Sequence, residues 1–170
     1  MGCASPSEDA SRLVQAMRLD SAVLLGYVLP MKHSLTATAV KPETNDPVFK
    51  LYLCLASTPS SIFTPIIADR FTRNLSSDEV KRAIVFFESL PGKKYIQNDL
   101  SLVPEYLKLP PEPGITSVAL TAVDNAAITA FSKTPEGGKI LLKNILDDEA
   151  TQKLLYSEWQ KTVEECRQKI

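Results

Sequence analysis

Apolar residues recur along most of the chain at the three- and four-residue spacing of a helix, and strand-like alternation is nearly absent. The clearest stripe predicts a C-terminal helix over 149–169 with one continuous apolar face. Its members are Leu155, Trp159, Val163, Cys166 and Ile170. The pattern therefore predicts an all-α protein.

Further helices are predicted over 7–18, 20–37, 47–56 and 60–73. Ser7 is placed to cap the first of them, and Asn45 or Asp46 to cap the third, with Pro47 at its start. Pro30 is expected to kink the second helix, because it removes a backbone donor from the helix interior.

Two segments, about 75–96 and 120–141, match at a constant offset of 45 residues. The positions that pair in kind are Leu75/Leu120, Ser76/Thr121, Glu79/Asp124, Ala83/Ile128, Phe86/Phe131, Gly92/Gly137 and Lys94/Lys139. The Ser/Thr and the acidic residue of each copy have the spacing of a capping box. The sequence of each copy predicts a capped helix whose Phe lies in a core, followed by a Pro/Gly turn. A second helix follows the turn, with its Lys on the solvent side.

The fold expected from these elements is one helical domain over residues 1–170, with residues 1–6 as a flexible tether. It is an irregular bundle of seven to nine helices that contains the duplicated hairpin. Four prolines between Pro104 and Pro113 mark the connection between the two halves.

The charge of the chain argues against binding to nucleic acid, and its hydropathy argues against a membrane-spanning helix. The chain carries 19 basic and 20 acidic residues, and its tightest basic group, Lys93-Lys94, is interpreted as a solvated helix turn. A nucleic-acid surface normally shows a basic excess, so nucleic acid is not expected as a partner. The longest apolar run, residues 22–30, is far shorter than the ~20 residues that cross a bilayer.

Gly2-Cys3 resembles the remnant of a bacterial lipoprotein signal, in which a small residue precedes the lipidated cysteine. Cys3 is then the lipid anchor, and the protein faces the periplasm, anchored to the outer membrane. The alternatives are a terminus with an incidental cysteine, or myristoylation of Gly2, for which Pro6 is a poor match.

The search for chemistry finds no catalytic constellation. His33, the only histidine, is expected at the surface, and no cluster with metal-ligand spacing is present. Cys54 and Cys166 fall on apolar faces; in an oxidising compartment they form a disulfide, and the alternative is two buried free thiols. Gly137-Gly138-Lys139 lacks the other residues of a phosphate-binding loop, so no cofactor is predicted.

The hairpin resembles an uncharacterised family of helical bacterial envelope proteins. The resemblance is best over residues 62–103, and it rests on Phe86-Phe87-Glu88-Ser89 and Gly92-Lys93-Lys94-Tyr95. The family places Pro directly after the Ser, whereas Leu90 intervenes here; Thr134-Pro135-Glu136-Gly137 follows the pattern more closely. The resemblance implies an exported helical bundle and no activity.

The sequence thus predicts a non-enzymatic envelope protein that binds another envelope or secreted protein, as an immunity-type inhibitor or an assembly factor. It reaches the membrane only through Cys3. The alternative class is a small-ligand or lipid carrier, or an enzyme with an unrecognised site, which requires a pocket with convergent polar groups.

Overall fold

The computed structural model of the chain describes residues 7–37, 46–143 and 145–170. These residues are 77% helical and include no strand, which confirms the all-α prediction. The α-helices are α1 Glu8–Met17, α2 Leu19–Ala37, α3 Pro47–Ala56, α4 Thr64–Asn74, α5 Ser77–Glu88, α6 Leu90–Ser101, α7 Val103–Tyr106, α8 Ala122–Ser132, α9 Pro135–Gly137 and α10 Glu149–Arg167. A 3-10 helix, η1 Ser60–Phe63, and a π-helix, η2 Gly138–Leu142, complete the set.

The helix starts follow the predicted caps, with one difference. The Ser7 side chain accepts from the Ala10 N–H, and the Asp46 side chain caps α3 by accepting from the Val48 N–H. The fourth helix was expected from residue 60, but residues 60–63 form η1 instead. Pro65 lies in the first turn of α4 and has no N–H to continue an α-helix from the preceding turn, so the α-helix begins at Thr64.

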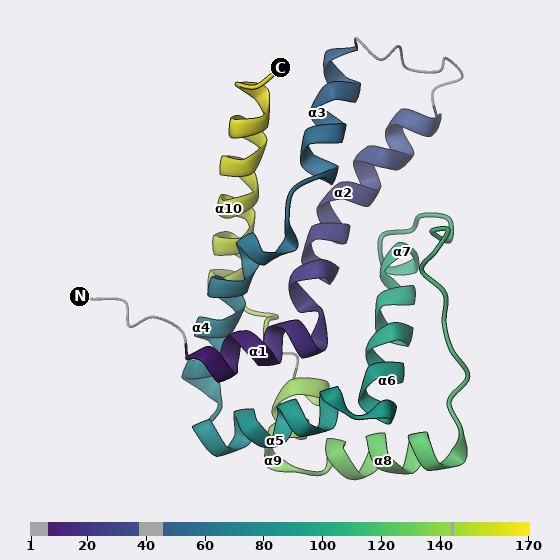
Figure 1. The fold of residues 1–170 in the computed structure, drawn as a ribbon, viewed down its shortest axis with the longest axis vertical. Coiled ribbons are helices and arrows are strands. Elements are labelled where there is room, and N and C mark those ends of the chain that lie inside the picture. The colour runs from purple at the N-terminus through teal and green to yellow at the C-terminus, as the bar shows by residue number, and fades with distance from the viewer. Residues whose placement is uncertain (1–6, 38–45, 144) are drawn as a thin grey trace, which may run out of the picture.

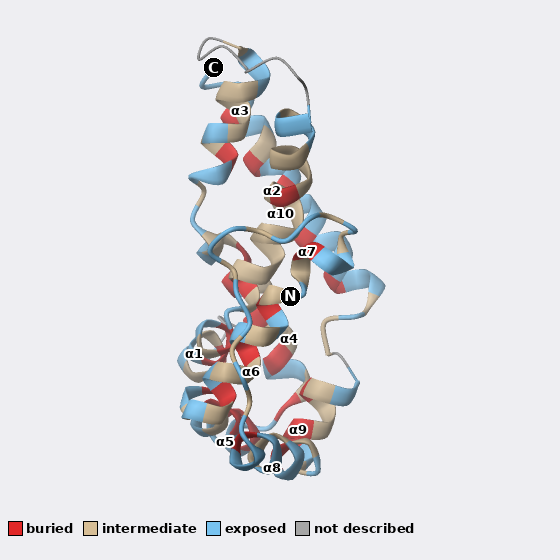
Figure 2. Ribbon diagram, turned by 90° about the vertical axis from the view of Figure 1, so that its right-hand side faces the viewer, coloured by how far each residue is buried: buried red, intermediate tan, exposed pale blue. Residues whose placement is uncertain are grey.

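The core forms where α1 packs across α4 and α5. Its largest fully buried side chains include Leu13, Phe63, Ile67, Phe71 and Phe87. In Figure 1, α2, α3 and α10 extend upward from this core, and α3 packs against both α2 and α10. The helix α6 rises beside them, and α8 crosses the base against α6, mostly exposed in Figure 2.

The apolar stripe predicted for the last helix is largely confirmed in α10. Leu155, Trp159 and Cys166 are buried, and Val163 is half-buried. Ile170 was placed on the same face, but it is 50% exposed. The reason is that α10 ends at Arg167, so the helical spacing no longer directs Ile170 toward the core.

The irregular connection between the two halves covers residues 107–121 and is fixed against two helices. Asn98 of α6 holds it with both side-chain atoms: Nδ2 donates to the Val118 carbonyl at 3.0 Å, and Oδ1 accepts from the Val118 N–H at 2.7 Å. Lys32 of α2 forms an ion pair with Glu112. The connection therefore forms part of the surface between α2 and α6.

Candidate functional site

Both copies of the hairpin begin with the predicted capping box. In α5 the Ser76 Oγ accepts from the Glu79 N–H at 3.3 Å, and the Glu79 carboxylate accepts from the Ser76 N–H at 2.7 Å. In α8 the corresponding distances between Thr121 and Asp124 are 3.2 and 2.8 Å. Each box satisfies two backbone donors that the first helical turn leaves free.

Each hairpin turn is closed by a hydroxyl. In the first copy, Ser89 Oγ donates to the Phe86 carbonyl at 2.5 Å and accepts from the Gly92 N–H at 3.3 Å. The equivalent residues of the second copy, with distances of 2.7 and 3.0 Å, are Thr134, Phe131 and Gly137. The hydroxyl thus caps the second helix and also satisfies a carbonyl at the end of the first.

The glycines allow the two helices of each copy to meet. A Cβ on Gly92 would lie 2.1 Å from the Phe86 carbonyl oxygen, and a Cβ on Gly137 would lie 1.8 Å from that of Phe131. Both distances are far below van der Waals contact. This geometry supports the close approach predicted for these glycines, and it leaves no room for a side chain.

Ion pairs join the two copies reciprocally. The Lys94 Nζ lies 2.6 Å from Asp124 Oδ2, and the Lys139 Nζ lies 2.7 Å from Glu79 Oε1. Each lysine belongs to one copy and binds the capping carboxylate of the other. The prediction of a solvent-facing lysine does not hold for Lys94, whose side chain is 24% exposed, whereas the Lys139 side chain is 39% exposed and Lys93 is exposed as predicted. The capping carboxylate carries a charge that its backbone bonds do not neutralise, and the lysine supplies the opposite charge.

These contacts shift the protonation of both capping carboxylates. The hydrogen bond from Lys94, followed by those from Thr121, lowers the pKa of Asp124 from 3.8 to about 2. The hydrogen bond from Lys139, with that from the Ser76 backbone, lowers the pKa of Glu79 as well. A carboxylate held ionised in this way is a poor proton donor near neutral pH, so neither residue is suited to acid catalysis.

A third ion pair between the copies has no counterpart in the repeat. Arg82 of α5 donates through Nε and one terminal nitrogen to the two carboxylate oxygens of Glu136, at 2.9 and 3.1 Å. The Glu136 side chain is only 2% exposed, and the hydrogen bond from Arg82 lowers its pKa. Glu136 occupies the position that Pro91 holds in the first copy. The two copies of the hairpin therefore form one structural interface that is joined by three ion pairs.

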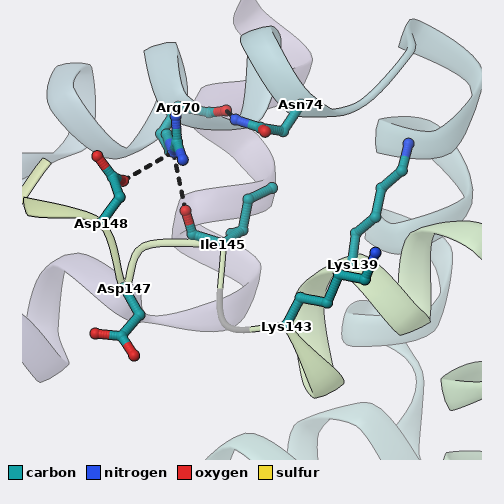
Figure 3. A pocket seen from close by; sticks show the side chains of 7 residues that line it. All are labelled: Arg70, Asn74, Lys139, Lys143, Ile145, Asp147 and Asp148. Carbon is teal, nitrogen blue, oxygen red and sulfur yellow. Dashed lines mark hydrogen bonds and ion pairs between the residues drawn. The ribbon is translucent and has the colours of Figure 1, made fainter. Parts of the chain in front are cut away.

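A polar cleft of about 330 Å³ opens beside this interface (Figure 3). Its lining residues are Arg70, Asn74, Lys139, Lys143, Ile145, Asp147 and Asp148. The Arg70 Nε lies 3.0 Å from both the Ile145 carbonyl oxygen and Asp148 Oδ2, and Asp148 caps α10. The side chain and backbone of Thr151 lower the pKa of Asp148, which makes it a poor proton donor.

Two of the charged groups in the cleft are already engaged, because Lys139 binds Glu79 and Arg70 binds Asp148, whereas Lys143 and Asp147 have no ion-pair partner among the described residues. Its lining contains no histidine, cysteine, serine or threonine that could act as a nucleophile or base. Among the described residues there is also no group of three or more His, Cys, Asp or Glu side chains placed to hold a metal ion.

Cys54 of α3 and Cys166 of α10 form a disulfide, with Cα atoms 5.8 Å apart. The pairing predicted for these residues is present, and the alternative of two free thiols is not. His33 differs from its prediction: it is half-buried, and its Nε2 is shielded from solvent with no hydrogen-bond partner in residues 7–37, 46–143 and 145–170.

The helix α3 carries an apolar surface that faces away from the core. Lys50 is its one charged residue, yet Leu55 is the only α3 residue that is buried. Val48 and Leu53 are 55% and 47% exposed. A helix that is apolar on all sides is normally enclosed by protein or lipid, whereas the main packing partners of α3 among the described residues are α2 and α10. We call the two exposed apolar residues of α3, Val48 and Leu53, together the α3 surface.

None of the described helices is by itself long and apolar enough to cross a membrane. One bent pair, Pro47–Ala56 with Ser60–Asn74, meets the length and hydropathy requirements together, with a bend of 71°. Much of the second member is core, since Ile67, Ala68 and Phe71 of α4 are fully buried. The pair is therefore weak support for a membrane segment.

Comparison with known proteins finds no matching family model, no similar curated protein and no matching solved structure. The fold and interface define the chain only as an all-α helical bundle with a paired internal hairpin. The resemblance to an envelope family remains a prediction. The lipid anchor predicted at Cys3 and the alternative at Gly2 lie outside the described residues.

Sequence reasoning missed two features. Nothing in the sequence indicated the Arg82–Glu136 pair, because these residues are 54 positions apart and neither is among the positions that match between the two copies. The α3 surface did give one: the segment Pro47–Ala56 contains a single charge and has no polar face. This composition is typical of a helix that protein or lipid encloses on every side.

Proposed function

We propose that the chain is a non-enzymatic protein of the bacterial envelope that binds another envelope or secreted protein through the α3 surface. The observation that carries the proposal is the exposure of Val48 and Leu53 on a helix with no polar face. A contiguous exposed apolar patch on a folded protein often marks a surface that another molecule covers.

The disulfide supports an oxidising compartment such as the periplasm, because disulfides rarely persist in a reducing cytosol. It also fixes the binding helix. Since Cys54 lies on α3 and Cys166 on α10, the bond holds α3 against a second helix while its outer side stays exposed. A rigid apolar helix loses little conformational entropy when a partner covers it.

Two forms of this function fit the fold: an immunity-type inhibitor that covers a secreted protein, and an assembly factor for an envelope complex. In both, the α3 surface contacts the partner, and the paired hairpins serve as the scaffold. An anchor at Cys3 would place the protein at the outer membrane. A lipid carrier is the alternative class, in which the α3 surface contacts acyl chains.

The test is site-specific photo-cross-linking in the envelope of the source organism. A photoreactive residue at Leu53 is expected to give a discrete protein adduct, and one at Asn125, exposed on the distant α8, is not. The double substitution Val48→Gln, Leu53→Gln is expected to lower the binding of the isolated partner by about tenfold or more, from the lost apolar burial. Lys50→Gln on the same helix is the matched control and should leave binding unchanged.

Three results would contradict the proposal. One is an adduct that forms equally well from Asn125, and another is the absence of any adduct from Leu53. The third is an adduct that contains lipid and no protein, which would establish the carrier alternative. Thermal melting of each variant shows whether a lost contact reflects the surface or the loss of the fold.

A further inference from the structure

A second cavity, of about 280 Å³, lies between α2, α6 and the connection 107–121. Its residues are different from those of the Arg70 cleft. Leu25 of α2, Leu100 of α6 and Ile115 of the connection give it apolar walls. The polar groups in its lining are Arg18, Gln97 and Thr116. No lining residue is acidic.

The wall formed by the connection is fixed in place. Gln97 Nε2 donates to the Thr116 carbonyl at 3.1 Å, and Asn98 holds Val118 through two hydrogen bonds. Ile115 follows Gly114, whose φ of +89° is a left-handed conformation that a residue with a side chain rarely adopts. The cavity is thus preformed, which reduces the entropy lost when a ligand binds.

Arg18 is the unusual residue in this lining. The chain has six arginines, and five of them have a carboxylate within 4 Å: Arg12, Arg70, Arg73, Arg82 and Arg167. Arg18 is exposed, and its side chain has no ion-pair or hydrogen-bond partner in the part of the chain that the structure describes. Its guanidinium is available to a ligand.

The backbone of Arg18 is also held in an unfavourable conformation. Its φ of 51° is left-handed, and its N–H donates to the carbonyls of Gln15 and Val14 at the end of α1. Among the described residues only Arg18, Lys108 and Gly114 have positive φ, and two of these three line the cavity. The left-handed conformation of Arg18 ends α1 and fixes the place of this residue in the cavity lining.

We propose that this cavity binds a carboxylate attached to a short apolar group. The guanidinium of Arg18 pairs with the carboxylate, for which its planar donors are suited. The apolar walls cover the remainder, and at ~30 Å³ for each water-sized group the cavity holds about nine such groups. The ligand is either a free aliphatic acid or the C-terminal residue of a peptide. This site is independent of the α3 surface.

The experiment follows backbone amide NMR shifts during titration with octanoate and with octanamide, which has the same chain without the charge. Octanoate is expected to shift the signals of Leu25, Leu100 and Ile115 and to bind about tenfold more tightly than octanamide. Arg18→Gln should bring octanoate affinity down to that of octanamide. Arg12→Gln, a matched substitution in the same region of the chain, should leave it unchanged.

Ile115→Trp fills the cavity while keeping Arg18, so it should abolish octanoate binding in a protein that melts normally. A Gly-Gly-Leu peptide, with its C-terminal amide as the uncharged control, shows whether the carboxylate comes from a peptide or from a free acid. If the peptide acid binds more tightly than octanoate, the ligand is a peptide C-terminus. If it binds more weakly, the ligand is a free aliphatic acid. Equal affinity for octanoate and octanamide would overturn the proposal. So would shifts confined to other residues, no shifts at all, or an equal effect of Arg12→Gln.

Discussion

The ring of Phe86 stacks on the ring of Phe131, with centroids 3.9 Å apart and planes 7° from parallel. The two residues hold the same position in the two copies of the hairpin, so the repeats meet through equivalent side chains. Phe87 packs edge-on against both rings, at 5.1 and 5.4 Å. The two copies therefore form one paired unit in which equivalent side chains contact each other, and each copy helps to bury the other.

The first prediction concerns this stack. Phe131→Ala removes a buried ring and its contacts with Phe86 and Phe87, and it should lower the free energy of unfolding by about 3–4 kcal/mol. Phe49→Ala removes the same group from a half-buried position in α3, outside the paired hairpins, and should cost clearly less. Urea unfolding of both variants measures the difference. Equal losses would show that the stack is not a centre of stability.

The second prediction concerns the glycine turns. A methyl group at Gly137 would collide with the Phe131 carbonyl, so Gly137→Ala should destabilise the protein by about 3 kcal/mol or more, beyond an ordinary overpacked site. Gly26→Ala is the matched control, because a Cβ there meets nothing within 4 Å and Gly26 lies inside α2. It should stabilise by up to about 1 kcal/mol. If thermal melting shows both variants above the melting temperature of the wild type, or both below it, the prediction is wrong.

Local patterns in the sequence determine much of the fold. The capping boxes at Ser76 and Thr121 were predictable, because a cap is formed by residues three positions apart. The glycine turns were predictable for the same reason. The all-α class follows from apolar spacing along the chain, which requires no knowledge of how the helices pack.

The contacts between the copies could not be predicted this way. The repeat showed that Lys94 and Lys139 are equivalent, but nothing local shows that each binds the other copy's carboxylate, 30 and 60 positions away. Arg18 belongs to no motif. Its significance depends on having no partner, and only the packed structure shows which arginines are paired.

The third prediction is a dependence of stability on acid. The pKa of Asp124 falls from 3.8 to about 2 on folding because of its contacts with Lys94 and Thr121. A lowered folded-state pKa contributes stability that is fully present above the unfolded pKa, and this stability is lost as pH falls from about 4 toward 2. The lowered pKa values of Glu79 and Glu136 act in the same direction.

Asp124→Asn isolates this contribution. The variant should be less stable than the wild type at pH 7, and the gap should shrink steadily as pH falls from about 4 to 2. Asp147→Asn, at an exposed carboxylate without an ion-pair partner in the described residues, is the control and should show no such convergence. Urea midpoints across this range test both. A gap that stays constant down to pH 2 would exclude the ion pair as its source.

The last prediction concerns the disulfide. The bond joins residues 112 positions apart, so reduction should lower the free energy of unfolding by about 2–4 kcal/mol through the gain of freedom in the unfolded chain. Because the main packing partners of α3 among the described residues are α2 and α10, the loss should appear first as faster amide hydrogen exchange in α3. Cys54→Ser should reproduce both effects without reductant, and Cys3→Ser should reproduce neither. If reductant leaves the melting midpoint and the α3 exchange rates unchanged, the bond does not hold this helix in place.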